Sequence, residues 1–284
     1  MRKNLLAVVV AVLVALGFQV PAVASTGGTP TGDNLYRNVG LILSYSEDGF
    51  RYRCTATLVR DDLLLTAAHC TDGVVGKVLV DFDSTIVAGD TKPDVSPFPT
   101  ADPKTGYTTS QLQDAGFESG DAYTHPQYSD FTDMKNWNDV GVVKLDRPVT
   151  DITPATIAGL GTLDAIGQNN LSKTLFRAVG YGTEVRKADS GPQKPTPMDY
   201  PLIRRYVDMP GQKLTPQILQ TNGTSTNGKD TGTTCFGDSG GPVFYNGEVV
   251  AVTSYGNNDV CRGVSGYQRV DILAAQDFLG GYLS

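Results

Sequence analysis

A serine flanked by glycines is the first candidate for chemistry. Ser239 lies in the run CFGDSGGP, from Cys235 to Pro242. Glycines on both sides leave the backbone unobstructed, so the hydroxyl can approach a carbonyl carbon as a nucleophile must. The same residues could form a plain turn that leads into the apolar run from Val243. A catalytic role for Ser239 therefore requires a base and a supporting carboxylate elsewhere in the chain.

Two further segments supply these groups. His69 lies in TAAHC, which begins at Thr66, and Asp139 lies in NDVGVVKL, which begins at Asn138. A neutral imidazole can accept a hydroxyl proton and later give it to a leaving amine, while a carboxylate fixes its tautomer. Taken alone, His69 would be interpreted as a structural histidine. The order His, Asp, Ser along the chain differs from the orders used by subtilisin-like and α/β-hydrolase enzymes.

All three segments resemble those of the chymotrypsin/trypsin-like serine peptidases. The resemblance extends over most of residues 25–284 and is specific around the motifs. It implies a triad of His69 as base, Asp139 as its partner and Ser239 as nucleophile, with no metal and no cofactor. It also implies an oxyanion hole made by the backbone N–H groups of Gly237 and Ser239. The only other histidine of the chain, His125, falls where the family has a structural histidine.

The resemblance further implies a substrate pocket. Its predicted residues are Thr233, Thr234, Ser254, Tyr255 and Gly256. Trypsin-like relatives carry an aspartate at the position of Thr233, so no fixed carboxylate is expected to meet a Lys or Arg side chain. We therefore predict cleavage after uncharged residues, either aromatic or large aliphatic ones.

Four cysteines in an exported protein indicate two disulfides, for which sequence alone allows three pairings. A zinc site made of four thiolates is the alternative, but the chain contains no Cys-x-x-Cys pair. The resemblance implies the pairs Cys54–Cys70 and Cys235–Cys261.

The N-terminus has the pattern of a secretory signal peptide. Basic residues precede an apolar run from Leu5 to Phe18, and Ala22-Val23-Ala24 follows. We expect cleavage after residue 24, a secreted protein, and no membrane association once the signal is removed. The formal net charge of −7 argues against nucleic acid as a partner. Expected partners are polypeptide substrates and protein protease inhibitors, and the expected state is a monomer.

The new N-terminus would have a role in the family mechanism. In relatives, a freed amino group pairs with the aspartate before the nucleophile, which is Asp238 here. This chain has no basic residue for propeptide cleavage between Lys3 and Arg37, yet Ser25-Thr26 is followed by two glycines. We therefore expect signal peptidase itself to create the active terminus, with the Ser25 amine bound to Asp238.

Short strands separated by turn-rich segments predict an all-β fold. Alternation from Arg51 to Arg60 predicts a half-buried strand, and Asn246-Gly247 between apolar runs predicts a hairpin. Asp271 is expected to cap a C-terminal helix that starts at Ile272 and ends before Gly280-Gly281. Residues 90–120 are interpreted as a long surface excursion.

The resemblance specifies two six-stranded antiparallel barrels with the active site between them. Residues 25–155 would form the barrel that carries His69 and Asp139, and residues 156–284 the barrel that carries Ser239 and the helix. Two other functions use the same residues. One is a catalytically inactive binding protein on this fold, and the other is an esterase with the same triad.

Overall fold

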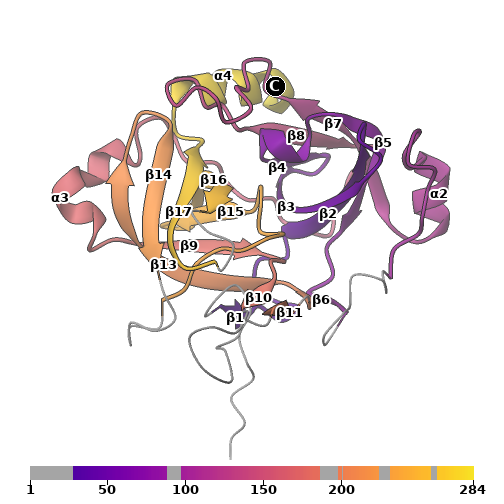
Figure 1. Ribbon diagram of the computed structural model, residues 1–284, viewed down its shortest axis with the longest axis horizontal. Coiled ribbons are helices and arrows are strands. Elements are labelled where there is room, and N and C mark those ends of the chain that lie inside the picture. The colour runs from indigo at the N-terminus through magenta and orange to yellow at the C-terminus, as the bar shows by residue number, and fades with distance from the viewer. Residues whose placement is uncertain (1–27, 88–96, 186–197, 200, 224–230, 257–260) are drawn as a thin grey trace, which may run out of the picture.

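The computed structural model describes residues 28–87, 97–185, 198–199, 201–223, 231–256 and 261–284. They form two antiparallel β-barrels side by side, with a short C-terminal helix lying across one end of both (Figure 1). The predicted fold class is confirmed. The proposed signal peptide and Ser25 lie outside the described residues. Within the described part of the chain, no helix has the length and apolarity needed to cross a membrane.

The first barrel is closed by six strands. In spatial order these are β2 (Val39–Ser46), β3 (Arg51–Arg60), β4 (Leu63–Thr66), β8 (Gly141–Leu145), β7 (Glu118–Thr124) and β5 (Val74–Asp81). β3 spans the predicted residues, but both of its faces are buried from Cys54 to Leu58. The strand is not half-buried because the face that carries Thr55 packs against the nucleophile loop, where the Thr55 N–H donates to Ser239 O at 2.8 Å.

The second barrel is closed by another six strands. Their order is β9 (Leu175–Gly180), β13 (Arg205–Leu214), β14 (Ile218–Gly223), β17 (Gly263–Arg269), β16 (Glu248–Gly256) and β15 (Pro242–Tyr245), which pairs again with β9. β15 and β16 form the predicted hairpin. Asn246 and Gly247 have φ of 52° and 87°, the left-handed values that a two-residue type I′ turn requires.

Five short strands of the described chain lie outside the barrels. β1 (Thr29–Pro30) pairs with β13, β6 (Thr85–Val87) with β12 (Leu202–Ile203), and β10 (Glu184–Val185) with β11 (Met198–Asp199). The short helices are η1 (Ala68–Cys70), α2 (Thr109–Asp114), η2 (Asp164–Ile166) and α3 (Gln168–Leu171).

One hydrophobic cluster continues from barrel to barrel. It contains Leu58 and Leu64 of the first barrel together with Val179 and Val252 of the second. Burial of apolar side chains across the junction fixes the barrels relative to one another. Groups contributed by different barrels can therefore be held at hydrogen-bond distance in the cleft between them.

Part of the predicted surface excursion is packed rather than loose. Phe98, Tyr107 and Leu112 are buried in one cluster with residues of β2 and β5, and α2 forms within this segment. Most other described residues of this connection between β6 and β7 are exposed or partly exposed, so it lies on the surface as predicted, while the buried side chains anchor it to the barrel. Residues 88–96 lie outside the described residues.

The C-terminal helix α4 (Leu273–Leu283) differs from its prediction at both ends. Asp271 does not cap it, because its carboxylate accepts the Leu163 N–H at 2.7 Å and Arg269 Nε at 2.9 Å. The helix also continues through Gly280-Gly281. Each glycine disfavours a helix by about 1 kcal/mol, and burial of Leu279 and packing of Tyr282 outweigh that cost.

Candidate active site

His69 and Asp139 form a close pair at the edge of the first barrel. η1 follows β4 directly and places His69 Nδ1 2.9 Å from Asp139 Oδ2 and 3.1 Å from Oδ1. The His69 backbone N–H also donates to Asp139 Oδ1 at 2.9 Å. Asp139 is fully buried, so its carboxylate needs these donors to compensate for lost hydration. This arrangement fixes the imidazole with Nδ1 toward the carboxylate and Nε2 toward the cleft.

Residues of the second barrel complete the environment of Asp139. Ser254 Oγ donates to Asp139 Oδ2 at 2.6 Å, and Trp137 Nε1 donates to Ser254 Oγ at 2.9 Å. The Asp139 N–H donates to Gln268 Oε1 at 3.0 Å. Ser254 was predicted from the sequence to line the substrate pocket, whereas sequence reasoning missed Trp137 and Gln268. The single tryptophan two residues before Asp139 was an available signal, whereas the role of Gln268 depends on strand pairing alone.

The backbone of the nucleophile loop makes hydrogen bonds to both barrels. Gly240 N donates to Thr253 O at 2.8 Å, and Thr55 Oγ1 donates to Gly237 O at 2.8 Å. Gly237 has φ of 98°, and a Cβ there would lie 2.8 Å from the guanidinium of Arg53. Only glycine suits this combination of conformation and close approach.

Two N–H groups of this loop are uncommitted. The N–H groups of Asp238, Gly240 and Gly241 all donate to backbone carbonyls. Among the described residues, those of Gly237 and Ser239 have no acceptor. Such a pair of donors beside a nucleophile is what an oxyanion hole requires.

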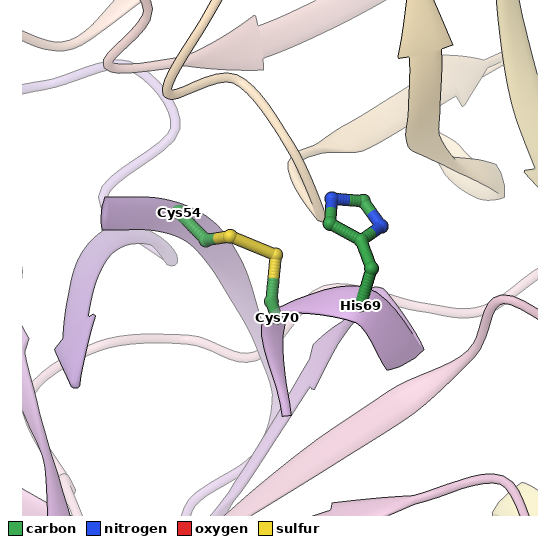
Figure 2. Close-up of side chains that lie close together, drawn as sticks. All are labelled: Cys54, His69 and Cys70. Atoms are coloured by element: carbon green, nitrogen blue, oxygen red, sulfur yellow. A yellow bond between two sulfur atoms is a disulfide. The ribbon is translucent and has the colours of Figure 1, made fainter. Parts of the chain in front are cut away.

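The two disulfides of the structure are Cys54–Cys70 and Cys235–Cys261, the pairing that the resemblance implies. Figure 2 shows the first bridge joining β3 to η1 directly beside His69. Cys54, His69 and Cys70 are close enough to hold a metal ion, but both sulfur atoms are in the disulfide and neither is a thiolate ligand.

His69 and Ser239 line one cavity of about 320 Å³. Their side chains make no hydrogen bond to each other within the described structure, which is common in unliganded sites of this kind. Of the predicted pocket residues, Thr234, Ser254, Tyr255 and Gly256 line the same cavity. Thr233 lies behind its wall, with Oγ1 2.7 Å from Ser265 Oγ. A larger hollow of about 940 Å³ beside Tyr36 and Arg177 contains none of the predicted site residues.

Sequence reasoning also missed an aromatic wall. Phe131 lines the cavity, and its ring lies 5.5 Å from the His69 ring and 5.2 Å from that of Trp137. Its φ of 60° is unusual for a bulky residue. No residue pattern around Phe131 predicts its positive φ.

Asp238 is buried behind the nucleophile loop. Its two carboxylate oxygens accept the N–H groups of Gly182 at 2.7 Å and Cys235 at 2.8 Å. Its predicted partner Ser25 lies outside the described residues.

The chain is similar to several curated proteases. Brachyurin from Leptuca pugilator is 29% identical over 219 residues, which cover 74% of this chain and 79% of brachyurin. Beta-fibrinogenase brevinase from Gloydius blomhoffii is 28% identical over 238 residues, with 82% and 84% covered. Snake venom serine protease Haly-2 from Gloydius brevicauda is 29% identical over 247 residues, with 84% and 78% covered.

Solved structures share the fold at lower identity. HL collagenase superposes with a TM-score of 0.59 at 17% identity, covering 92% of this chain and 96% of the collagenase. Human heparin binding protein gives a TM-score of 0.56 at 17% identity, covering 91% and 96%. The family model described as Trypsin matches residues 27–276, nearly the whole chain. The protein is therefore a member of the trypsin family of serine proteases.

Proposed function

We propose that the protein is a secreted serine endopeptidase that hydrolyses peptide bonds with Ser239, His69 and Asp139. The observation that carries this proposal is the pairing of His69 with the buried carboxylate of Asp139, together with the position of His69 and Ser239 in one cavity. The two uncommitted N–H groups of the nucleophile loop add a place for a developing negative charge.

The proposed reaction proceeds through an acyl-enzyme. Ser239 Oγ attacks the carbonyl carbon as its proton passes to His69 Nε2, and the carbonyl oxygen becomes an oxyanion held by the N–H groups of Gly237 and Ser239. The C–N bond then breaks and His69 gives the proton to the leaving amine. Water repeats the sequence on the ester, activated by the same imidazole. Asp139 keeps the proton of neutral His69 on Nδ1 and stabilises the imidazolium that forms.

We also propose that cleavage follows uncharged residues rather than lysine or arginine. The cavity presents no carboxylate among its described lining residues. The hydroxyl of Thr233 is bonded to Ser265 behind the cavity wall. Without a negative group, a cationic side chain would lose its hydration and gain no ion pair.

For activation, the proposal is that removal of residues 1–24 frees the Ser25 amine to pair with Asp238. Gly28 is buried and Thr29–Pro30 pair with β13, so the first described residues of the chain lie against the second barrel. The test compares residues 25–284 carrying the authentic terminus with the same chain carrying one non-removable residue ahead of Ser25. Equal peptidase activity would contradict the proposal.

Secretion is proposed from the leader and from the relative that is named a venom protease. Interaction with protein protease inhibitors and a monomeric state are proposed as well. Size-exclusion chromatography with light scattering, run with and without an inhibitor of this protease class, tests both.

The inactive binding protein and the esterase remain the competing functions. A heparin binding protein shares this fold, so the fold alone does not decide between them. Ser239→Ala should lower casein hydrolysis by about four to six powers of ten without unfolding the protein. A serine-directed phosphonylating reagent should label the wild type only. Full casein hydrolysis by Ser239→Ala would refute the proposal, and ester hydrolysis without peptide hydrolysis would favour the esterase.

A further inference from the structure

Trp137 lies directly behind the wall of the active-site cavity. It is the only tryptophan of the chain and comes two residues before Asp139. The residue is 9% exposed and is not among the described residues that line the cavity. Its ring nevertheless lies 5.2 Å from that of Phe131 and 5.5 Å from that of Tyr255, both of which line it. Any contribution of Trp137 to catalysis must therefore act through its neighbours.

The indole fixes the direction of one hydrogen bond at the site. An indole N–H can only donate, and Trp137 Nε1 donates to Ser254 Oγ at 2.9 Å. Since this donor occupies a lone pair of Oγ, the Ser254 hydroxyl proton points to its other partner in the described structure, Asp139 Oδ2 at 2.6 Å. Trp137 and Ser254 are both buried, so bulk water does not replace the indole as donor. The bonds run in one direction, from the indole to the carboxylate.

The oxygen that ends this chain of hydrogen bonds also holds the catalytic imidazole. Asp139 Oδ2 lies 2.9 Å from His69 Nδ1 as well as 2.6 Å from Ser254 Oγ. A hydroxyl that accepts a hydrogen bond becomes a stronger donor, because each bond in such a chain polarises the next. Ser254 therefore restrains Asp139 Oδ2 more tightly when the indole donates to it, and the orientation of the imidazole depends on that oxygen.

We propose that Trp137 is a positioning residue for the triad. Its indole N–H directs the Ser254 hydroxyl toward Asp139 and so helps to hold His69 in the geometry that proton transfer requires. The inference rests on the proposed function, because it takes His69 as the base of a peptidase. It goes beyond that function by assigning part of the reaction rate to a residue that does not line the cavity among the described residues.

The kinetic test removes the indole N–H and keeps the ring. Amber suppression at position 137 introduces 3-benzothienylalanine, which retains the fused rings and has sulfur in place of the N–H. In this variant kcat should fall about threefold with KM nearly unchanged, since one neutral hydrogen bond is lost while the contacts of the ring with Phe131 and Tyr255 remain. A change in the packing of the cavity wall would raise KM instead.

Tyr107→Phe is the matched control for this replacement. Tyr107 is a buried aromatic residue whose hydroxyl donates to Pro99 O at 2.9 Å, and it is not among the described residues that line the cavity. The control deletes one buried aromatic donor and should leave kcat unchanged.

A double-mutant cycle separates positioning from packing. The same replacement of Trp137 is made in Ser254→Ala, where the indole has lost the acceptor through which it acts. In that background the replacement should not lower kcat further. If Trp137 served only to pack the wall, the loss would be the same in both backgrounds, because independent effects add.

A spectroscopic measurement that needs no activity separates this inference from the proposed function. Isotopically labelled histidine gives signals from two rings, those of His69 and His125, and His125→Phe assigns them. Replacing Trp137 by 3-benzothienylalanine should move the resonance of the His69 Nδ1 proton, which faces Asp139 Oδ2, and leave that of His125 in place. Tyr107→Phe should move neither.

The outcomes of the two measurements are distinct. A loss of kcat that disappears in Ser254→Ala, together with a moved His69 resonance, supports the inference. An unchanged kcat, an equal loss in both backgrounds, or an unmoved His69 resonance overturns it. If the wild type hydrolyses no peptide, the proposed function fails, and the His69 resonance alone then decides whether the indole positions the imidazole.

Discussion

The two histidines of the chain occupy opposite kinds of environment. His69 has a buried carboxylate on Nδ1, while its Nε2 has no hydrogen-bond partner among the described residues and its side chain remains 20% exposed to the cleft. His125 is buried, with Nδ1 accepting the Gln127 N–H at 3.1 Å and Nε2 donating to Ala274 O at 3.3 Å. Its ring lies 5.0 Å from that of Phe278 on α4.

This contrast separates a histidine that can transfer protons from one that joins segments. A general base needs one nitrogen oriented by a partner and the other free to meet a substrate, which only His69 provides. Both nitrogens of His125 are engaged by backbone groups, and burial lowers the pKa of its imidazole. The difference comes from which partners the fold supplies, since the residue type is the same.

Exchanging each histidine for alanine should give opposite outcomes. His69→Ala should lower kcat/KM by about four to six powers of ten and leave thermal unfolding nearly unchanged. His125→Ala should keep kcat/KM within a few fold. Peptide hydrolysis and calorimetry on both variants check this. Substantial peptidase activity in His69→Ala would show that His69 is not the catalytic base.

Removing the negative charge beside His69 should have the next largest effect on catalysis. Asp139→Asn places an amide where the carboxylate accepts the Nδ1 proton, which favours the wrong tautomer, and a drop of about 10⁴ in kcat is expected. The contribution of His125 to stability should not change in this variant. The measurement is kcat at saturating substrate. A decrease of less than tenfold would show that Asp139 is not the partner that orients the base.

A smaller effect on kcat is expected for Ser254, which contacts Asp139 and not His69. Ser254→Ala deletes a donor to Asp139 and leaves Trp137 Nε1 without its acceptor, so kcat should fall about tenfold, roughly the worth of one charged hydrogen bond. Ser119→Ala is the matched control, because Ser119 is also buried and donates to a carboxylate, that of Asp146, away from the site. The control should lose stability but no activity. Equal losses of kcat in both variants would indicate a general effect of destabilisation.

Local residue patterns were enough to predict the parts of the structure that depend mainly on residues close in sequence. Alternation predicted β3 with its observed bounds, and Asn246-Gly247 predicted the hairpin because the turn needs two left-handed residues. The nucleophile loop was recognised because its glycines serve a local backbone geometry.

Other features depend on contacts between distant segments, and these were missed or mispredicted. Asp271 was expected to cap α4, but Arg269 and the Leu163 N–H take its carboxylate. The roles of Gln268 and Thr253 arise from the pairing of β16 with β17 and from the nucleophile loop, which no residue pattern near them records. The division of the chain at residue 155 stays a prediction.

The structural role of His125 should appear in unfolding experiments. His125→Ala removes two hydrogen bonds and the ring packed on Phe278, so the free energy of unfolding should fall by about 2 kcal/mol. Urea denaturation followed by circular dichroism measures it. His69→Ala, whose imidazole is partly exposed, should lose clearly less, and the reverse order would contradict the assignment of roles.

The smallest effect is the pH dependence that His125 confers on stability. Its folded pKa is lowered by burial, with the Ala274 contact opposing that shift, while an unfolded histidine titrates near about 6.5. Between these two values the unfolded chain binds more protons than the folded one. The stabilising contribution is therefore complete above about pH 6.5 and declines as the pH falls from there to the folded pKa, below which it is constant. His125→Phe keeps a ring against Phe278 but cannot titrate, so the stability difference between wild type and variant should shift in favour of the variant between pH 7.5 and 5. Because other groups titrate equally in both proteins, the difference isolates His125, and a gap that stays constant or widens in favour of the wild type would show that this imidazole is not held neutral by the fold.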